Sequence, residues 1–327
     1  MPTVILLDVS LSMTRRTRSS LKGDDNPRLL DLAIHGIHHF LDGLASDSKL
    51  EYTALIVFSS LYEVFAKFSR DFESIKRVCT TAVAYDKTCI ETALQGVEAL
   101  VTEEWGVSVP INIVLVTDGS VGSGEGSLKE SLLNPKSGNP FPVPFSFPSF
   151  LSIICLSPLH SIRENKNLLD KMIRMNYDLG EILAPEGNVD TNSVEQCFKR
   201  LLQSRYGKFV GSMTCGHFKC SIQLSPAPCF QPSWGMIMNL YRYNDETIDH
   251  PQLKVPTNIN VIGFLDMQDI SNPPYLSRHL VLPIADSSSS SSTKRSKQED
   301  TGRAPSFCVL LHGSLKIEKM VAVAKLG

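Results

Sequence analysis

Five side chains that could supply oxygen ligands lie in three separate stretches of the sequence: Asp8, Ser10, Ser12, Thr88 and Asp118. Mg²⁺ binds six oxygen atoms in a near-octahedral arrangement and gives up its bound waters reluctantly. Ser10, Ser12 and Thr88 offer neutral hydroxyls as direct ligands, while Asp8 and Asp118 can act through bound water and orient the hydroxyls. Two carboxylates only just balance a divalent charge, so the ion could accept an anionic oxygen from a partner. The pattern therefore predicts a Mg²⁺ site that binds rather than catalyses.

The three stretches lie next to predicted secondary-structure elements. Asp8 comes directly after an apolar run at residues 3–7, and Asp118 follows a continuous apolar run at 111–116 that is typical of a strand buried on both faces. The third stretch comes just before a predicted helix at 90–103. In an open α/β sheet, ligands bind outside the carboxyl ends of the strands. We therefore expect all three stretches to meet at one edge of the sheet.

Each stretch also has a simpler explanation. The aspartate and serines of residues 8–12 could cap a turn, and Asp118-Gly119 could form one. Thr88 and Glu91 form the pattern T-x-x-E, which is a helix capping box. Capping and metal ligation are compatible for a threonine. The order of the three stretches, and their place on the predicted elements, favour the metal site.

The first half of the chain, residues 1–205, alternates apolar strands with amphipathic helices. After Asn26-Pro27, which predict a helix start, apolar residues recur at spacings of three and four through residue 44. Further strands are predicted at 51–58, 62–65 and 151–156, and further helices at 72–81, 162–175 and 193–203. Such alternation is typical of a doubly wound, mostly parallel α/β sheet.

The second half, residues 206–327, is different. Short apolar runs are separated by Pro, Gly, Asn and Ser, which predicts a second, all-β domain, either a sandwich or a barrel. The runs lie at 218–224, 260–265, 280–284, 308–311 and 320–324. Residues 286–303 contain six consecutive serines followed by TKRSKQED, which predicts a disordered loop between two strands. Its basic cluster could be a nuclear import signal or simply a solvated loop.

The bulk composition excludes several classes of protein. The chain has 327 residues and a formal net charge of -2, which gives no global attraction to nucleic acid or to a membrane surface. No apolar stretch approaches the roughly 18 residues of a membrane span, and the N-terminus lacks the basic region of a signal peptide. The eight scattered cysteines are therefore expected to be reduced thiols in the cytosol or nucleus.

A basic segment follows the first of the three stretches. Arg15, Arg16, Arg18 and Lys22 could contact phosphates and give weak, salt-sensitive binding of RNA or DNA. The segment lacks the interleaved aromatic residues on which single-stranded bases stack. An exposed basic loop without a ligand is the slightly preferred interpretation.

Two other signals leave alternatives open. Residues 139–150 carry four prolines and four phenylalanines, which could form an exposed partner-binding patch or fix the loop onto its own domain. Cys215, His217, Cys220 and Cys229 are the nearest approach to a zinc set. Because side chains alternate along a strand, these four would converge only at a tight turn, so buried thiols are the favoured interpretation.

The three stretches resemble a known family. DVSLS, DKTCIETAL and VLVTDG are similar to the metal-ion-dependent adhesion site of von Willebrand factor A domains, whose pattern is D-x-S-x-S, a threonine before a helix and an aspartate after a central strand. The match to that pattern is complete. The resemblance implies that Ser10, Ser12 and Thr88 are direct ligands and that Asp8 and Asp118 act mainly through water.

A second resemblance covers the whole chain. The segments YTALIVFSSLYEVF, NPFPVPFSFPSF, NPPYLSRHLVLPIA and PSFCVLLHGSLKIEKMVAVAKLG resemble the Integrator complex subunit 14 family. The resemblance implies a nuclear scaffold protein that supports small nuclear RNA processing and transcription attenuation. It also implies a second domain similar to the β-barrel of Ku, and Integrator subunits 13 and 10 as partners. Residues 160–250 match weakly, and the family normally continues past Gly327 into a helical region, which puts contacts made by that region in doubt.

An enzyme is the competing class. A phosphatase with an aspartyl nucleophile needs a second carboxylate two residues later as general acid or base. Here that position is Ser10, which cannot play the role. A serine hydrolase would need a G-x-S-x-G elbow, which the sequence lacks. We therefore predict an interaction protein that is not an enzyme.

Overall fold

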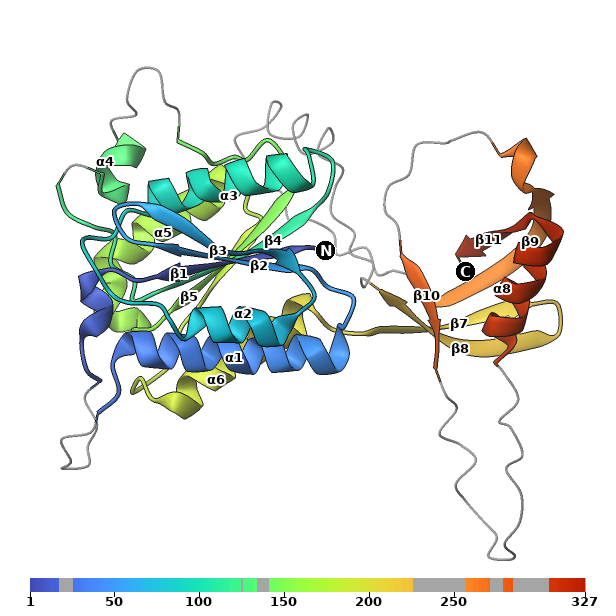
Figure 1. Cartoon of the computed structure of the whole chain (residues 1–327), viewed down its shortest axis with the longest axis horizontal. Coiled ribbons are helices and arrows are strands. Elements are labelled where there is room, and N and C mark those ends of the chain that lie inside the picture. The colour runs from blue at the N-terminus through green and yellow to red at the C-terminus, as the bar shows by residue number, and fades with distance from the viewer. Residues whose placement is uncertain are drawn as a thin grey trace, which may run out of the picture. The chain divides into compact units, whose positions relative to one another are not determined.

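A computed structural model describes residues 1–17, 26–124, 126–133, 141–225, 257–270, 279–284 and 306–326. The chain divides into two compact units, Met1–Tyr206 and Gly207–Gly327 (Figure 1). The two units are described separately.

The first unit is built on a six-stranded sheet with the order β3-β2-β1-β4-β5-β6. The strands are β1 (Thr3–Asp8), β2 (Thr53–Phe58), β3 (Tyr62–Ser69), β4 (Ile111–Thr117), β5 (Ser149–Cys155) and β6 (Gly180–Leu183). All neighbouring pairs are parallel except β2 with β3, which form an antiparallel edge. The predicted mostly parallel sheet is confirmed. The prediction missed β6, whose four residues are too few to show a period.

Helices cover both faces of this sheet (Figure 1). The helices are α1 (Leu29–Asp47), α2 (Phe72–Cys79), α3 (Ile90–Glu104), α4 (Leu128–Leu133), α5 (Arg163–Met175) and α6 (Thr191–Arg205). In the central strand β1, Val4 and Leu6 pack on the side of α3 and α5, while Ile5 and Leu7 pack on the side of α1 and α6. Every residue of β1 is buried, as expected for a strand between two helical layers.

One predicted helix start is wrong and another is confirmed. Helix α1 begins at Leu29 with Arg28 as its N-cap, rather than at Asn26-Pro27, and the Asp31 carboxylate accepts from both the backbone N–H and the guanidinium of Arg28. Helix α3 begins at Ile90 as predicted, but its N-cap is Cys89, so the alternative in which Thr88 forms a capping box with Glu91 does not hold. The hydroxyl of Thr88 is therefore available for another role.

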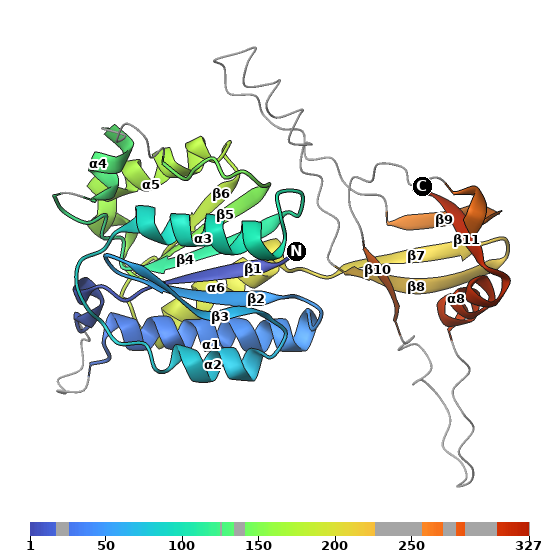
Figure 2. The ribbon, with the colours of Figure 1, turned by 45° about the horizontal axis from the view of Figure 1, so that its top comes forward.

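The second unit contains a five-stranded sheet with the order β10-β8-β7-β9-β11, which curls into an open half-barrel (Figure 2). The strands are β7 (Phe209–Cys215), β8 (Phe218–Ser225), β9 (Asn258–Asp266), β10 (Leu280–Pro283) and β11 (Met320–Leu326). Strands β7 and β9 are parallel, and the other neighbouring pairs are antiparallel. The predicted all-β class of this domain is confirmed. The turn between β7 and β8 is only Gly216-His217, and the fourth residue of the zinc set, Cys229, lies outside the described residues.

One predicted strand is wrong. Residues 308–311 lie in a helix, α8 (Phe307–Glu318), which packs Cys308 against Met213, Ile222 and Leu224 of the sheet. The serine-rich stretch 286–303 lies outside the described residues. Among the helices that the structure describes, none combines the length and apolar character needed to cross a bilayer.

Candidate metal site

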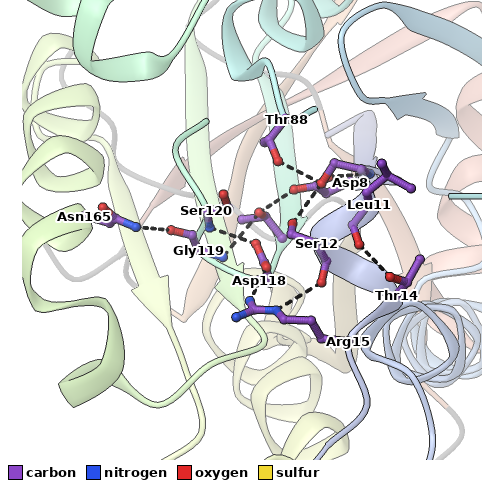
Figure 3. Close-up of polar contacts among 12 residues, drawn as sticks. Asp8, Leu11, Ser12, Thr14, Arg15, Thr88, Asp118, Gly119, Ser120 and Asn165 are labelled. Carbon is purple, nitrogen blue, oxygen red and sulfur yellow. Dashed lines mark hydrogen bonds and ion pairs between the residues drawn. The ribbon is translucent and has the colours of Figure 1, made fainter. Parts of the chain in front are cut away.

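The three predicted stretches meet at the carboxyl edge of the first sheet (Figure 3). Asp8 is the last residue of β1, and the chain continues through Ser10 into a short 3-10 helix, η1 (Leu11–Thr14). Asp118 follows the last residue of β4, which pairs in parallel with β1. Thr88 lies two residues before α3. The structure therefore brings together all five predicted side chains, which come from segments up to 110 residues apart in the sequence.

The three hydroxyls form a chain of hydrogen bonds. Thr88 Oγ1 donates to Ser10 Oγ at 2.8 Å, and Ser10 Oγ lies 3.0 Å from Ser12 Oγ. Ser10 and Thr88 are buried, with 1% and 4% of their surface exposed, while Ser12 is half-buried. Three hydroxyl oxygens in contact with one another, one of them partly open to solvent, suit a shared hard cation.

Both carboxylate oxygens of Asp8 accept hydrogen bonds. Oδ1 accepts from the Ser10 backbone N–H at 2.9 Å, and Oδ2 accepts from Thr117 Oγ1 at 2.7 Å. Burial raises the pKa of Asp8 to about 6, and the nearby charge of Asp118 adds to this rise, while the hydrogen bonds oppose it. The fold thus buries a carboxyl group whose ionised form is not fully stabilised by its neighbours. A bound divalent cation would stabilise the ionised form.

Asp118 is held in a similar way by different partners. Its Oδ1 accepts from the Ser120 backbone N–H at 2.8 Å, and its Oδ2 forms an ion pair with Nη2 of Arg15. The Asp118 side chain is fully buried, whereas 62% of the Arg15 side chain is exposed. Arg15 Nε also donates to the carbonyl of Ser12 at 3.2 Å (Figure 3). Arg15 therefore connects the first and third stretches.

Backbone contacts hold the loops in register. The Leu11 N–H donates to the carbonyl of Asp86 at 2.8 Å, and the Tyr85 N–H donates to the carbonyl of Val9 at 2.8 Å. These bonds fix the segment before Thr88 against the segment after β1.

A glycine brings the third loop against the second. Gly122 has φ +75°, and a Cβ atom there would lie 2.5 Å from the carbonyl oxygen of Thr88. Residues with a Cβ avoid this conformation, and the contact leaves no room for one. Gly122 thus permits the close approach that places Thr88 at the site.

The donor set fits Mg²⁺ better than a softer ion. In the part of the chain that the structure describes, no group of three or more His, Cys, Asp or Glu residues is arranged to hold a metal. The candidate site consists instead of three hydroxyls and two carboxylates, which are hard oxygen ligands. The alternative of isolated turn-capping does not account for the hydrogen bonds that join the first and second stretches.

The predicted basic segment is only partly described. Arg15 is engaged with Asp118, and Arg16 forms an isolated backbone bridge with Arg28. Arg18 and Lys22 lie outside the described residues.

The proline- and phenylalanine-rich segment packs on its own domain over the part that is described. Val143, Phe145 and Phe147 are buried in the core on the α3 side of the sheet, and the rings of Phe145 and Phe147 stack at 5.1 Å. The ring of Phe150 lies under the guanidinium of Arg205, 3.5 Å from its centroid. Of the two interpretations left open, the structure supports the one in which these side chains fix the loop to its domain.

Sequence reasoning missed two contributors to the site. No role was predicted for Thr117, which is the last residue of β4 and donates to Asp8. Asn165 of α5 donates to the carbonyl of Gly119 at 2.9 Å and steadies the third loop. The strand register could have indicated Thr117, because Leu7 pairs with Val116 and the next residues are Asp8 and Thr117. No sequence signal indicates Asn165.

Comparisons with known proteins agree with both units. Residues 3–120 match the model of the von Willebrand factor type A domain, and residues 206–327 match that of the Integrator complex subunit 14 β-barrel domain. Integrator complex subunit 14 of Xenopus tropicalis is 41% identical over the whole of this chain, as is that of Homo sapiens. The chain belongs to the Integrator complex subunit 14 family. It spans 64% of the length of both these relatives.

The similarity extends to more distant members of the Integrator complex subunit 14 family. The Drosophila melanogaster protein is 27% identical over the whole of this chain, which covers 68% of the fly protein. Among solved structures, the PilB minor pilin of Streptococcus sanguinis is 14% identical, with a TM-score of 0.49, and the match covers 62% of this chain and 61% of the pilin. A similarity at that level adds nothing to the family assignment.

Proposed function

We propose that this chain is a non-catalytic scaffold subunit of the nuclear Integrator complex. In that role it supports small nuclear RNA 3′-end processing and transcription attenuation, and it binds Integrator subunits 13 and 10. The names of the relatives and the matched β-barrel domain support membership of the complex. The further roles rest on the family resemblance.

We further propose that the candidate site binds Mg²⁺ and through it a carboxylate of a partner. The observation that carries this proposal is the hydrogen-bonded chain of Thr88, Ser10 and Ser12, which come from two distant segments. These three hydroxyls would be direct ligands, and Asp8 and Asp118 would hold bound waters. Because Asp8 and Asp118 would not contact the ion directly, its charge would not be fully neutralised. The ion would therefore still attract a carboxylate from a partner.

The surroundings of the site support a protein partner. Leu11 in η1 is 58% exposed, Leu61 in the turn between β2 and β3 is 68% exposed, and Tyr85 is 41% exposed. Asp86 connects the three segments, since its carbonyl accepts from Leu11 and its carboxylate accepts from Ser60, which precedes Leu61. Apolar side chains beside a cation suit a protein segment that carries an acidic residue.

The same geometry argues against the alternatives. An aspartyl nucleophile needs a second carboxylate two residues later, but that position is Ser10, whose N–H donates to Asp8 and whose hydroxyl accepts from Thr88. For nucleic-acid binding, only two of the four predicted basic residues are described, and the Arg15 guanidinium faces Asp118 in the structure. The alternative of a nucleic-acid-binding module therefore has less support than protein binding.

Calorimetric titration of the chain with Mg²⁺ tests the site. Ser12→Ala and Thr88→Ala each remove one direct ligand, and we expect each to abolish measurable Mg²⁺ binding while the circular dichroism spectrum stays unchanged. Thr102→Ala is a matched control, because Thr102 is exposed on α3 outside the site. Unchanged Mg²⁺ affinity in both ligand variants would refute the assignment.

A further inference from the structure

Arg15 has a place in the site that the family's ligand pattern does not include. Its guanidinium pairs with Asp118 Oδ2 and donates to the Ser12 carbonyl, so it lies beside one proposed direct ligand and one proposed water-holding carboxylate. The other oxygen of Asp118 is engaged by the Ser120 N–H. Arg15 is thus the cation that the structure provides for this carboxylate.

The backbone of Arg15 is fixed, while its side chain is free to move. Residue 15 caps η1 through a hydrogen bond from its N–H to the Ser12 carbonyl, and its own carbonyl accepts from the Leu29 N–H at 3.0 Å. The adjacent helix is anchored by Met13, which is fully buried. The side chain, however, is 62% exposed. Its guanidinium can therefore leave Asp118 for solvent without disturbing the loop.

Breaking the ion pair has a very different free-energy cost for Arg15 and for Asp118. An exposed guanidinium is solvated again when it leaves, so little is lost on its side. A fully buried carboxylate without a counter-charge is strongly unfavourable. Asp118 therefore requires a cation at all times, and the cation can be either Arg15 or a metal ion. A guanidinium that stays beside Mg²⁺ would instead repel it.

We propose that Arg15 is a built-in competitor of Mg²⁺, so that metal binding exchanges the Arg15 guanidinium for the ion at Asp118. This inference rests on the proposed Mg²⁺ site and adds the residue that sets its affinity. If this exchange occurs, the site binds Mg²⁺ more weakly than the same five oxygen-bearing side chains would bind it without Arg15.

Calorimetric Mg²⁺ titration of the full chain tests the exchange with three variants. Arg15→Ala should tighten Mg²⁺ binding by at least about fivefold, the equivalent of losing one exposed ion pair, because the Asp118 end of this pair is buried. Arg15→Lys keeps the competing charge, so its dissociation constant should stay near that of the parent chain. Arg16→Ala removes a neighbouring positive charge that donates to the carbonyl of Asn26, and it should leave the affinity unchanged.

Thermal unfolding gives a second, independent measurement. In EDTA, Arg15→Ala should unfold at a lower temperature than the parent chain, because Asp118 is then buried without a counter-charge. Saturating Mg²⁺ should remove that difference. A deficit that persists equally in EDTA and in Mg²⁺ would show that Arg15 has only a structural role and would overturn the inference.

The outcomes separate this inference from the proposed function. If the parent chain binds Mg²⁺ and Arg15→Ala binds it equally or more weakly, the exchange is refuted and the metal site stands. If Arg16→Ala tightens binding as much as Arg15→Ala, the effect is one of overall charge and the exchange is also refuted. If neither the parent chain nor Arg15→Ala binds Mg²⁺, both the site and the exchange are refuted.

Discussion

Asp8 shows how one residue can favour function at the expense of stability. Its carboxyl is buried, and its pKa is raised from 3.8 to about 6. Between these values the folded chain binds more protons than the unfolded chain, so stability falls as pH rises through this range. A shift of about 2 units corresponds to about 3 kcal/mol of lost stability at neutral pH. The fold keeps a charge that would be costly without a bound cation.

The first prediction follows from this cost. Asp8→Asn should stabilise the chain in EDTA at pH 7 by about 1–3 kcal/mol, because it removes the buried charge and keeps a hydrogen-bonding group of the same shape. It should also abolish Mg²⁺ binding. Urea denaturation at pH 4 and pH 7 measures the effect, and the gain should shrink at pH 4, where the parent carboxyl is protonated. A variant less stable than the parent chain at pH 7 would contradict the prediction.

The loop after β4, which contains Gly122 and Gly124, shows that the path of the backbone can determine where a site residue lies. Gly122 and Gly124 lie in the same loop and have similar positive φ angles, +75° and +67°. A Cβ at Gly122 would meet the Thr88 carbonyl oxygen at 2.5 Å, whereas a Cβ at Gly124 would meet nothing within 4 Å. The pair therefore separates the cost of the conformation from the cost of the contact.

The second prediction uses that pair. Gly122→Ala and Gly124→Ala should share a conformational penalty of about 1 kcal/mol. Gly122→Ala should carry an additional loss of about 1–3 kcal/mol, since the backbone must shift away from Thr88. It should also weaken Mg²⁺ binding, which Gly124→Ala should leave unchanged. Denaturation and Mg²⁺ titration of both variants measure this, and equal behaviour in the two would show that Gly122 does not position Thr88.

The third prediction concerns the phenylalanine-rich segment. Phe145 is 1% exposed and stacks on Phe147 in the core, so Phe145→Ala should destabilise the chain by about 3–5 kcal/mol. Leu133→Ala in α4 removes a side chain that is 57% exposed and should change stability by less than about 0.5 kcal/mol. Thermal unfolding of both variants tests this. If Phe145→Ala changed the stability only slightly, the partner-binding interpretation of this segment would be favoured instead.

The elements themselves were predictable where the apolar pattern had one explanation. Strand β4 is a continuous apolar run between two helical layers, and α1 shows apolar residues at a clear helical spacing. The run FCVLL at the start of α8 has no period that separates helix from strand, because five residues are too few. It is a helix because one side packs Cys308 and Leu311 against the second sheet. That contact depends on tertiary structure and leaves no mark in the local sequence.

The candidate site shows the same division. The meeting of the five side chains at one edge of the sheet was predictable, because each follows or precedes a recognisable element. The contacts of Arg15 with Asp118 and of Asn165 with Gly119 were not, since they join residues 103 and 46 positions apart. The chain must fold before these pairs exist. Sequence spacing can therefore indicate which oxygen-bearing side chains meet at one place, but not which neighbours contact them there.

At the scale of the whole molecule, the two units offer different kinds of binding surface. The metal site proposed in the first unit would coordinate one carboxylate of a partner. The second unit exposes large apolar side chains on several elements, including Phe218 in β8, Ile262 in β9 and Ile317 in α8, at 64%, 66% and 79%. Stable protein interfaces bury about 1,200–2,000 Å² in total, far more than one coordinated side chain provides. If the chain has the proposed scaffold role, the second unit is expected to supply the larger interface with its partners.

The fourth prediction tests this expectation in the full chain. Ile262→Asp places a charge on the exposed surface of β9, and we expect it to reduce the Integrator subunits that co-purify from nuclei by tenfold or more, since a buried unpaired charge costs several kcal/mol. Thr88→Ala should reduce them less. Leu133→Asp makes the same kind of change at a 57% exposed position of the first unit and should have little effect. Because Ile262 is already exposed, its replacement should leave the fold intact, which circular dichroism can verify. Full retention of the subunits by Ile262→Asp together with their loss in Thr88→Ala would instead make the metal site the principal contact.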